Sequence, residues 1–262
     1  MVNIVTCIKV VPRPEEVVVE EKTKTVDRAK ARSILNPPDL NAIEASLSLR
    51  DKHGGRVTLI SMGPPFAEKF MKFGLAMGAD DAILLSDRAF AGADTLATSY
   101  VLAKAVTKIG NCDLVVCGEE SSDGATGQVP PGIAEWLGIS QMTYAKSVDV
   151  VPSRNVLVGM RDNGKGEESV EVSMPAVVAV ESGINEPRFM DFDAKKSFEN
   201  VKIKVWTAAD IGAEAARIGF TGSPTSVGAV KTLKGRERKR EKVRGTPEEQ
   251  AKAVWNKIKG MV

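Results

Sequence analysis

The chain has 262 residues, of which 43% are hydrophobic, and carries a formal net charge of +2. Residues 231–244 hold eight basic and two acidic side chains, a local net charge of +6. The rest of the chain therefore carries a net charge of −4, which disfavours nucleic-acid binding by that part of the protein. One histidine, His53, excludes a metal site built from several histidines, and three cysteines without C-x-x-C spacing provide neither a disulfide framework nor a zinc ribbon.

The amino-terminal half alternates between strand and helix patterns. Residues 2–10 are almost all apolar or β-branched, which predicts a buried strand. A helix is predicted to start at Asn36-Pro37-Pro38-Asp39, with the prolines in its entry and Asp39 as its cap, and to end at His53-Gly54-Gly55. Further elements are expected as strand 56–61, helix 66–77, strand 82–86, helix 94–109, strand 113–117 and helix 128–138. Repeated β-α units of this spacing predict an α/β fold with a parallel sheet flanked by helices.

The pattern changes to consecutive strands from Gln141 onwards. They are expected at 144–151, 155–161, 167–173 and 176–180, with Asp162-Asn163-Gly164 as a hairpin turn, and we interpret them as an antiparallel extension of the sheet. Smaller elements are expected as a peripheral hairpin at 17–26, a strand near 201–205, a helix near 207–212 and an amphipathic helix from Pro247 to Ile258. This organisation predicts an α/β domain over residues 1–190 and an extended carboxyl-terminal arm over residues 191–262.

The sequence lacks the features of a secreted or membrane-inserted protein. The first residues are typical of a strand and not of a signal sequence, and no apolar run reaches the roughly 18 residues that a membrane helix requires. The cysteine pattern favours a reducing compartment. We therefore expect a cytoplasmic protein without direct membrane insertion.

The segment after the fourth predicted strand is the strongest candidate for a ligand site, because open parallel sheets bind ligands at the carboxyl ends of their strands. It runs from Gly118 to Pro131 and contains three glycines that let the backbone approach a ligand. Thr126 and Gln128 offer hydrogen-bonding groups, and the prolines begin a helix whose amino end attracts phosphate. Glu119 and its neighbouring glutamate would repel phosphate and suit a ribose or base better. Without a Walker lysine or a G-x-G-x-x-G pattern, an ordinary strand-helix loop is an equally good interpretation.

A second candidate lies between Ser86 and Thr95, where small residues precede Asp94. Small residues leave room for a flat ring, and the Thr95 hydroxyl at a helix amino end could stabilise negative charge on a ring such as a reduced flavin. A plain helix cap by Asp94 is the simpler interpretation, which the sequence alone favours. Two cysteines bracket a buried strand and are expected in the core, whereas Cys7 at a strand end could line the pocket without reacting.

Short motifs in a fixed order make the chain resemble the β subunit of electron transfer flavoproteins, also called the FixA type, over nearly its whole length. The motifs are Lys9-Val-Val-Pro12, Asn36-Pro-Pro-Asp39, Met62-Gly-Pro64, Ala76-Met-Gly-Ala-Asp80, the 118–131 segment, Met174-Pro-Ala-Val-Val178, Asn185-Glu-Pro-Arg-Phe189 and Gly222-Ser-Pro-Thr225. Each motif alone is weak, but the ordered set is specific. The resemblance implies a Rossmann-like, adenine-nucleotide-binding fold that takes part in electron transport.

The family divides by the nucleotide that this subunit holds. Members that only carry electrons bind AMP with a loop of the pattern Asp-Asp-Asp-x-Asn-Gln-Thr, whereas electron-bifurcating members have Asp-Gly-x-Thr-x-Gln-Val. Residues 123–129 read Asp-Gly-Ala-Thr-Gly-Gln-Val, which resembles the bifurcating pattern. The resemblance thus implies that FAD replaces AMP, with its isoalloxazine near residues 90–95. The cofactor-binding residues so implied are Cys7, Ile8, Lys9, Asn36, Pro37, Pro38, Asp39, Met62, Gly63, Phe90, Ala91, Gly92, Asp94, Thr95, Gly118, Glu119, Ser122, Asp123, Gly124, Ala125, Thr126, Gly127, Gln128 and Val129.

The resemblance also implies partners. An α subunit would hold the other FAD and contact the carboxyl-terminal arm, and NADH would donate electrons. The acceptors would be a flavin-dependent dehydrogenase or quinone oxidoreductase on the high-potential side and ferredoxin or flavodoxin on the low-potential side. The docking segment would comprise Ile184, Asn185, Glu186, Pro187 and Arg188. We attribute the basic residues 231–244 to subunit or partner docking, with no role in nucleic-acid binding.

Two alternatives stay open on the sequence. The first is an AMP-binding β subunit of a non-bifurcating electron transfer flavoprotein. The second is an adenine-nucleotide-binding module with no redox role. We assign no catalytic residue and no metal ligand. In the flavoprotein interpretations a flavin would carry the redox chemistry.

Overall fold

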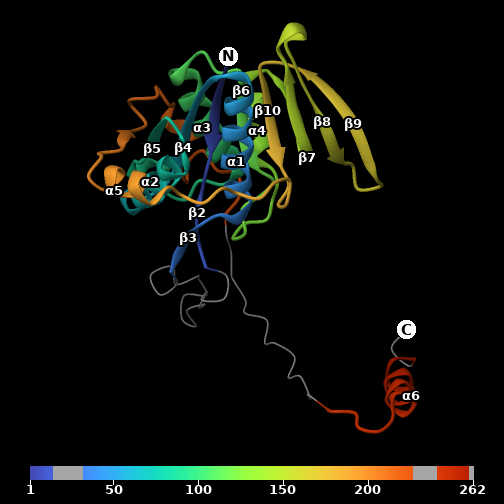
Figure 1. The fold of residues 1–262 in the computed structure, drawn as a ribbon. Helices are drawn as coiled ribbons and strands as arrows, with labels where there is room; N and C mark the ends of the chain where they lie inside the picture. The colour runs from blue at the N-terminus through green and yellow to red at the C-terminus, as the bar shows by residue number, and fades with distance from the viewer. Residues whose placement is uncertain (14–31, 227–240, 260–262) are drawn as a thin grey trace, which may run out of the picture. The chain divides into compact units, whose positions relative to one another are not determined.

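The computed structural model describes residues 1–13, 32–226 and 241–259. Its internal contacts separate a compact unit, Met1–Val230, from a second unit, Lys231–Val262. In the described part of the first unit, a nine-stranded sheet has the order β11-β5-β4-β1-β6-β10-β7-β8-β9 (Figure 1).

The first unit alternates strands and helices as far as β7. The strands of the sheet are β1 (Val2–Cys7), β4 (Gly55–Met62), β5 (Asp81–Leu85), β6 (Leu114–Gly118), β7 (Ser140–Val151), β8 (Val156–Asp162), β9 (Glu167–Ser173), β10 (Ala176–Val180) and β11 (Lys204–Trp206). The helices are α1 (Pro37–His53), α2 (Glu68–Met77), α3 (Thr95–Ile109), α4 (Val129–Leu137) and α5 (Phe192–Glu199). Two short strands, β2 (Val10–Pro12) and β3 (Ser33–Leu35), form a separate antiparallel pair.

The strands from β11 to β7 pair in parallel, and β8 and β9 extend one edge in antiparallel fashion. The predicted α/β fold with a parallel sheet flanked by helices is therefore confirmed. The prediction for residues 176–180 is wrong in one respect, because β10 pairs in parallel with both β6 and β7 and does not belong to an antiparallel extension. All of β10 is buried, and an unbroken apolar strand is typical of parallel pairing between two covered faces.

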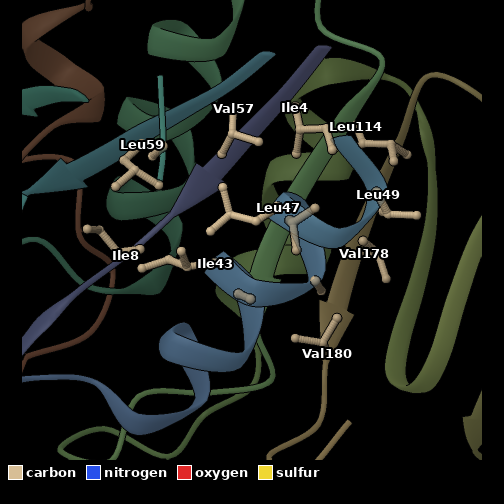
Figure 2. Close-up of a cluster of buried hydrophobic side chains, with 14 of the residues drawn as sticks. Ile4, Ile8, Ile43, Leu47, Leu49, Val57, Leu59, Leu114, Val178 and Val180 are labelled. Carbon is tan, nitrogen blue, oxygen red and sulfur yellow. The ribbon is translucent and has the colours of Figure 1, made fainter. Parts of the chain in front are cut away.

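Two hydrophobic clusters lie on opposite faces of the sheet. On one face, Ile43 and Leu47 of α1 pack with residues such as Ile4 of β1 (Figure 2). On the other face, the cluster contains Val101 of α3 and Ile133 of α4. Burial of one such aliphatic side chain contributes roughly 1.5–3 kcal/mol, so the two layers together hold the strands whose ends form the candidate site.

The elements predicted after residue 190 are confirmed in part. The strand expected near 201–205 is β11, which pairs with β5, so this part of the chain still contributes to the sheet. The helix expected near 207–212 is absent, since residues 208–212 form turns. The sequence pattern misses α5, which contains few apolar residues. The hairpin expected at 17–26 lies outside the described residues. Contact of residues 191–262 with an α subunit stays a prediction.

The second unit contains α6 (Pro247–Ile258), as predicted. The Thr246 hydroxyl accepts a hydrogen bond from the Glu249 N–H, and the Glu249 carboxylate accepts one from the Thr246 N–H, which forms a capping box. Trp255 is the most exposed of the large apolar residues on this helix. Most of the basic run lies outside the described residues. Over the described part of the chain, no helix combines the length and apolar character needed to cross a membrane.

Candidate functional site

The candidate site lies where the order of the strands reverses. From β1 the chain passes through α1 to β4 and through α2 to β5, and α3 then returns it to β6 on the other side of β1. The carboxyl ends of β1 and β6 therefore flank a topological switch point, where open α/β sheets bind ligands. The segments that follow these two strands, residues 7–9 and 118–129, are both predicted to bind the cofactor.

Asn36 joins three of the predicted segments. Its Nδ2 donates to Asp39 Oδ1 at 3.0 Å and to the Glu120 carbonyl oxygen at 2.9 Å, and its Oδ1 accepts from the Ser122 N–H at 3.0 Å. Its own N–H donates to the Lys9 carbonyl oxygen at 2.9 Å. Through its side chain and its backbone, this one buried residue thus fastens the start of α1, the segment after β1 and the loop after β6 to one another.

Asp39 is a buried carboxyl group and not the predicted helix cap. Asn36 occupies the cap position, and Asp39 lies within the first turn of α1. Asp39 Oδ2 accepts from the Lys9 N–H at 2.6 Å, and the Gly118 N–H provides a further hydrogen bond. Burial raises the pKa of Asp39 to about 7, although the hydrogen bonds from Asn36 and from the two N–H groups oppose this rise. The carboxyl group accepts hydrogen bonds from the segment after β1 and from the end of β6, which a local capping rule does not predict.

Gly118 ends β6 directly against the first turn of α1. A Cβ atom at this position would lie 2.5 Å from Asp39 Oδ1 and 2.7 Å from Pro38 Cβ. The glycine therefore lets the helix approach the strand, whereas the sequence pattern attributed it to a close ligand.

Lys9 holds the loop after β6. Its Nζ lies 2.6 Å from Asp123 Oδ1 and 3.1 Å from Ser121 Oγ. The N–H groups of Gly124 and Ala125 both donate to the Ser121 carbonyl oxygen, at 3.1 and 2.7 Å. Because the Lys9 charge is balanced by Asp123, recognition of a phosphate here would depend mainly on backbone N–H groups.

At the end of this loop the backbone passes from a left-handed to a right-handed conformation. Gly127 has a φ of +62°, and Gln128 has a φ of −90° and a ψ of −20°. Neighbouring residues of opposite hand can turn consecutive N–H groups towards one point, an arrangement that binds anions. Pro130 and Pro131 have no N–H, so the donors at the start of α4 are those of residues 127–129.

The second predicted segment lies next to this loop. The Thr95 hydroxyl donates to Gln128 Oε1 at 2.9 Å, and the exposed Thr126 hydroxyl is 3.5 Å from the Gln128 N–H. The starts of α3 and α4 are therefore adjacent, and the loop after β6 contacts both Lys9 and Thr95.

Asp94 caps α3, as the simpler interpretation of the sequence proposed. Its Oδ1 accepts from the N–H groups of Leu96 and Ala97 at 3.0 and 3.1 Å. Its Oδ2 accepts from the N–H and the hydroxyl of Thr225 at 3.1 and 2.8 Å. Both oxygens are thus bonded within the chain, and the capping role accounts for the residue without a ligand. Nearby, the Phe220 ring lies against Gly92, where an added Cβ atom would be 2.2 Å from the ring.

Several predicted cofactor residues point into the core. Cys7, Ile8 and Phe90 are buried in the hydrophobic clusters, so only their backbone groups could meet a ligand. A hydrogen bond with Cys117 and burial raise the pKa of the Cys7 thiol well above its usual value, which agrees with an unreactive side chain. Gly63, which follows β4, donates through its N–H to the carbonyl oxygen at the end of β5 at 3.0 Å.

The predicted docking segment, residues 184–188, is fastened to α1. The Asn41 side chain donates to the carbonyl and amide oxygens of Asn185 at 2.8 and 3.0 Å, and the Asn185 side chain donates to the Asn41 carbonyl oxygen at 3.0 Å. Arg188 forms a two-pronged ion pair with Glu44, at 2.8 and 2.9 Å. Although burial opposes it, this pair lowers the pKa of Glu44.

The apolar residues of this region differ in exposure. Ile184 packs against the core, whereas Phe189 is 98% exposed. Met190, the next residue, contributes to a pocket of about 580 Å³ that is also lined by Pro65, Phe66, Glu68, Lys69, Lys72 and Phe73. Phe189 is therefore better placed than Ile184 to serve as an exposed anchor.

Tyr144 and His53 are not among the predicted site residues. Tyr144 of β7 places its hydroxyl 3.1 Å from the position that a Cβ atom of Gly127 would occupy. His53 lies at the opposite end of α1 from Asn36 and contacts Asp149 at 2.9 Å. Tyr144 thus joins the candidate site, and the sequence offers no local signal for it.

Comparison with known proteins gives consistent matches. Residues 23–211 match the model of the electron transfer flavoprotein domain. The chain is 43% identical over 235 residues to an electron transfer flavoprotein subunit beta of Clostridium acetobutylicum, covering 89% of this chain and 90% of the relative. It is 43% identical over 232 residues to the protein FixA of Azorhizobium caulinodans, covering 86% of this chain and 82% of that relative.

Proposed function

The chain belongs to the electron transfer flavoprotein β-subunit (FixA) family, and we propose that it binds FAD and takes electrons from NADH for electron bifurcation. It would work with an α subunit that holds a second FAD. The proposed acceptors are a quinone-linked flavoprotein or other flavin-dependent dehydrogenase and a ferredoxin or flavodoxin, in the cytoplasm. The 123–129 pattern of the bifurcating subgroup motivates the choice of FAD over AMP.

The observation that supports this proposal best is the contact between Thr95 and Gln128, with its 2.9 Å hydrogen bond. It places the start of α3 beside the loop after β6, so a single extended ligand could contact both. AMP would end at its phosphate group beside residues 127–129, whereas FAD has a second, flat half that would extend beyond this point. Ala91, Gly92 and Ala93 are small, and the exposed Phe220 ring that lies against Gly92 would have to move aside for such a ring.

The residues of the site fit an adenine dinucleotide by their chemistry. The N–H groups of residues 127–129 would hold phosphate oxygens, and the polar residues around Asn36 would fix the loop that carries them. Thr95 and the amino end of α3 would stabilise negative charge on the flat ring. Bound FAD would supply hydride acceptance from NADH and onward transfer of single electrons.

The first alternative, an AMP-binding subunit, uses the same adenosine site but leaves the 90–95 segment without a ligand. Membership of this family favours both flavin-linked interpretations over a nucleotide-binding module with no redox role.

Release and counting of nucleotides tests the proposal directly. We expect the purified αβ complex, once denatured, to release two FAD and no AMP for each pair of subunits. One FAD together with one AMP would instead identify a non-bifurcating electron carrier. A complex without flavin absorbance would exclude both.

Replacing Phe189 by serine is expected to slow electron transfer to the partner dehydrogenase about tenfold or more, because truncation of a central apolar anchor commonly costs at least about 2 kcal/mol of binding. The rate of NADH-dependent reduction of the partner measures this effect. Reduction of a small artificial acceptor, which needs no docking, should not change. Val205→Ser removes another exposed apolar side chain, on β11, and serves as the matched control. Equal rates for both variants would contradict a docking role for Phe189.

A further inference from the structure

An irregularity in β7 turns Tyr144 towards the candidate site. In the pairing with β10, Met142 lies opposite Val178 and Ala145 lies opposite Val180, so β7 contains one residue more than its partner. Such a β-bulge changes the face on which the following side chains lie. Met142 and Ala145 are both fully buried in the same hydrophobic cluster, although an odd separation of three would place them on opposite faces of a regular strand.

The bulge leaves Tyr144 in an unfavourable backbone conformation. Its φ is +54°, in the left-handed region that bulky side chains rarely adopt. Glycine or asparagine would satisfy this geometry with less strain. The side chain is also 46% exposed, so burial of the ring does not compensate for the strain. A strained aromatic residue with little burial needs another explanation, and such strain is concentrated at ligand sites.

The position of the Tyr144 hydroxyl supplies that explanation. It lies against Gly127, where an added Cβ atom would be 3.1 Å away, and Gly127 is the first of the three residues whose N–H groups would hold the phosphate. No hydrogen bond joins this hydroxyl to the described residues. A phenol can donate one hydrogen bond, and phosphate oxygens are strong acceptors.

We propose that Tyr144 is a ligand-binding residue whose hydroxyl donates a hydrogen bond to the phosphate groups of the bound adenine nucleotide, beside the N–H groups of residues 127–129. This inference rests on the proposed nucleotide-binding function and adds a specific contact to it. The contact does not depend on whether that nucleotide is FAD or AMP, because both carry phosphate at the same end of the adenosine.

The test uses the αβ complex with the FAD of the α subunit in place and the nucleotide of the β subunit removed, with FAD and AMP as the two probes. We expect Tyr144→Phe to raise the dissociation constant of the nucleotide that the wild type binds by about tenfold, since a hydrogen bond to a charged group is lost. Tyr144→Gly should weaken binding at least as much. The thermal midpoint of the nucleotide-free Tyr144→Gly complex should equal or exceed that of the wild type, because the left-handed backbone suits glycine.

Asn155→Gly provides the control, since Asn155 also has a positive φ of +53° but lies at the turn between β7 and β8. The dissociation constant of the nucleotide from the Asn155→Gly complex should match that of the wild type. Wild-type affinity in Tyr144→Phe would overturn the proposed contact. A lower thermal midpoint in Tyr144→Gly, with unchanged affinity in both variants, would show that the ring is only structural. A wild-type complex that binds neither probe would overturn the proposed function itself.

Discussion

Replacing Gly118 by alanine is expected to empty the nucleotide site and to destabilise the chain by about 3 kcal/mol. The added Cβ atom would lie 2.5 Å from Asp39 Oδ1 and 2.8 Å from the Pro38 carbonyl carbon, so the start of α1 must move away from β6. Overpacking of this kind typically costs about 1–3 kcal/mol, and each hydrogen bond that breaks adds about 1 kcal/mol. The displaced Asn36 would no longer hold the loop after β6 through Glu120 and Ser122.

Nucleotide content and the free energy of unfolding, both measured on the αβ complex, test this prediction. Gly74→Ala is the matched control, because its Cβ atom would lie 2.3 Å from Leu59 Cδ1 within the core and touches none of the site residues. It should lower stability while the nucleotide content stays normal. The contact between α1 and β6 would not control the site if Gly118→Ala retained its nucleotide. The same would hold if Gly118→Ala lost no more nucleotide than Gly74→Ala for the same loss of stability.

The helices and parallel strands around the switch point follow from local patterns. Leu47 and Ile43 recur at helical spacing and are fully buried, so the helical face predicted from the sequence is the face that packs on the sheet. The pattern does not specify which strands become neighbours. The apolar run at 176–180 predicts a strand correctly, but its place between β6 and β7 depends on a crossover that no local residue encodes.

The sequence predicts the segments of the candidate site but not the role of each residue, because local patterns do not specify contacts between distant parts of the chain. Segments at the strand ends could be identified because the topology of an α/β sheet fixes where its ligands bind. The individual roles depend on contacts distant in sequence, such as the hydrogen bond from the Ser122 N–H to Asn36. Asp39 resembles a cap only when its neighbours in sequence are considered. Tyr144 joins the site through a bulge that arises from strand pairing, so its sequence context gives no indication of it.

The buried carboxyl group of Asp39 is expected to make the chain less stable as the pH rises from about 4 to about 7. Its pKa in the folded chain is raised from 3.8 to about 7, so the folded state keeps a proton that the unfolded state releases. The stabilisation is fully present below pH 3.8, decreases through the interval and is absent above pH 7. At about 1.4 kcal/mol for each pH unit, the total change is on the order of 4 kcal/mol.

Comparison of the wild type with Asp39→Asn isolates this change, because asparagine does not titrate. The difference in free energy of unfolding, wild type minus variant, should fall between pH 4 and 7 and then remain constant. Asp149→Asn gives a control of opposite sign, since contacts with Lys52 and His53 lower the pKa of Asp149 to about 2 against an opposing effect of burial. Its stabilisation is present above pH 3.8 and is lost only as the pH falls towards 2. A difference for Asp39→Asn that stays constant from pH 4 to 8 would mean that the carboxyl group ionises freely. In that case, Asp39 would be an ordinary carboxylate in the first turn of α1, and burial would not control its charge.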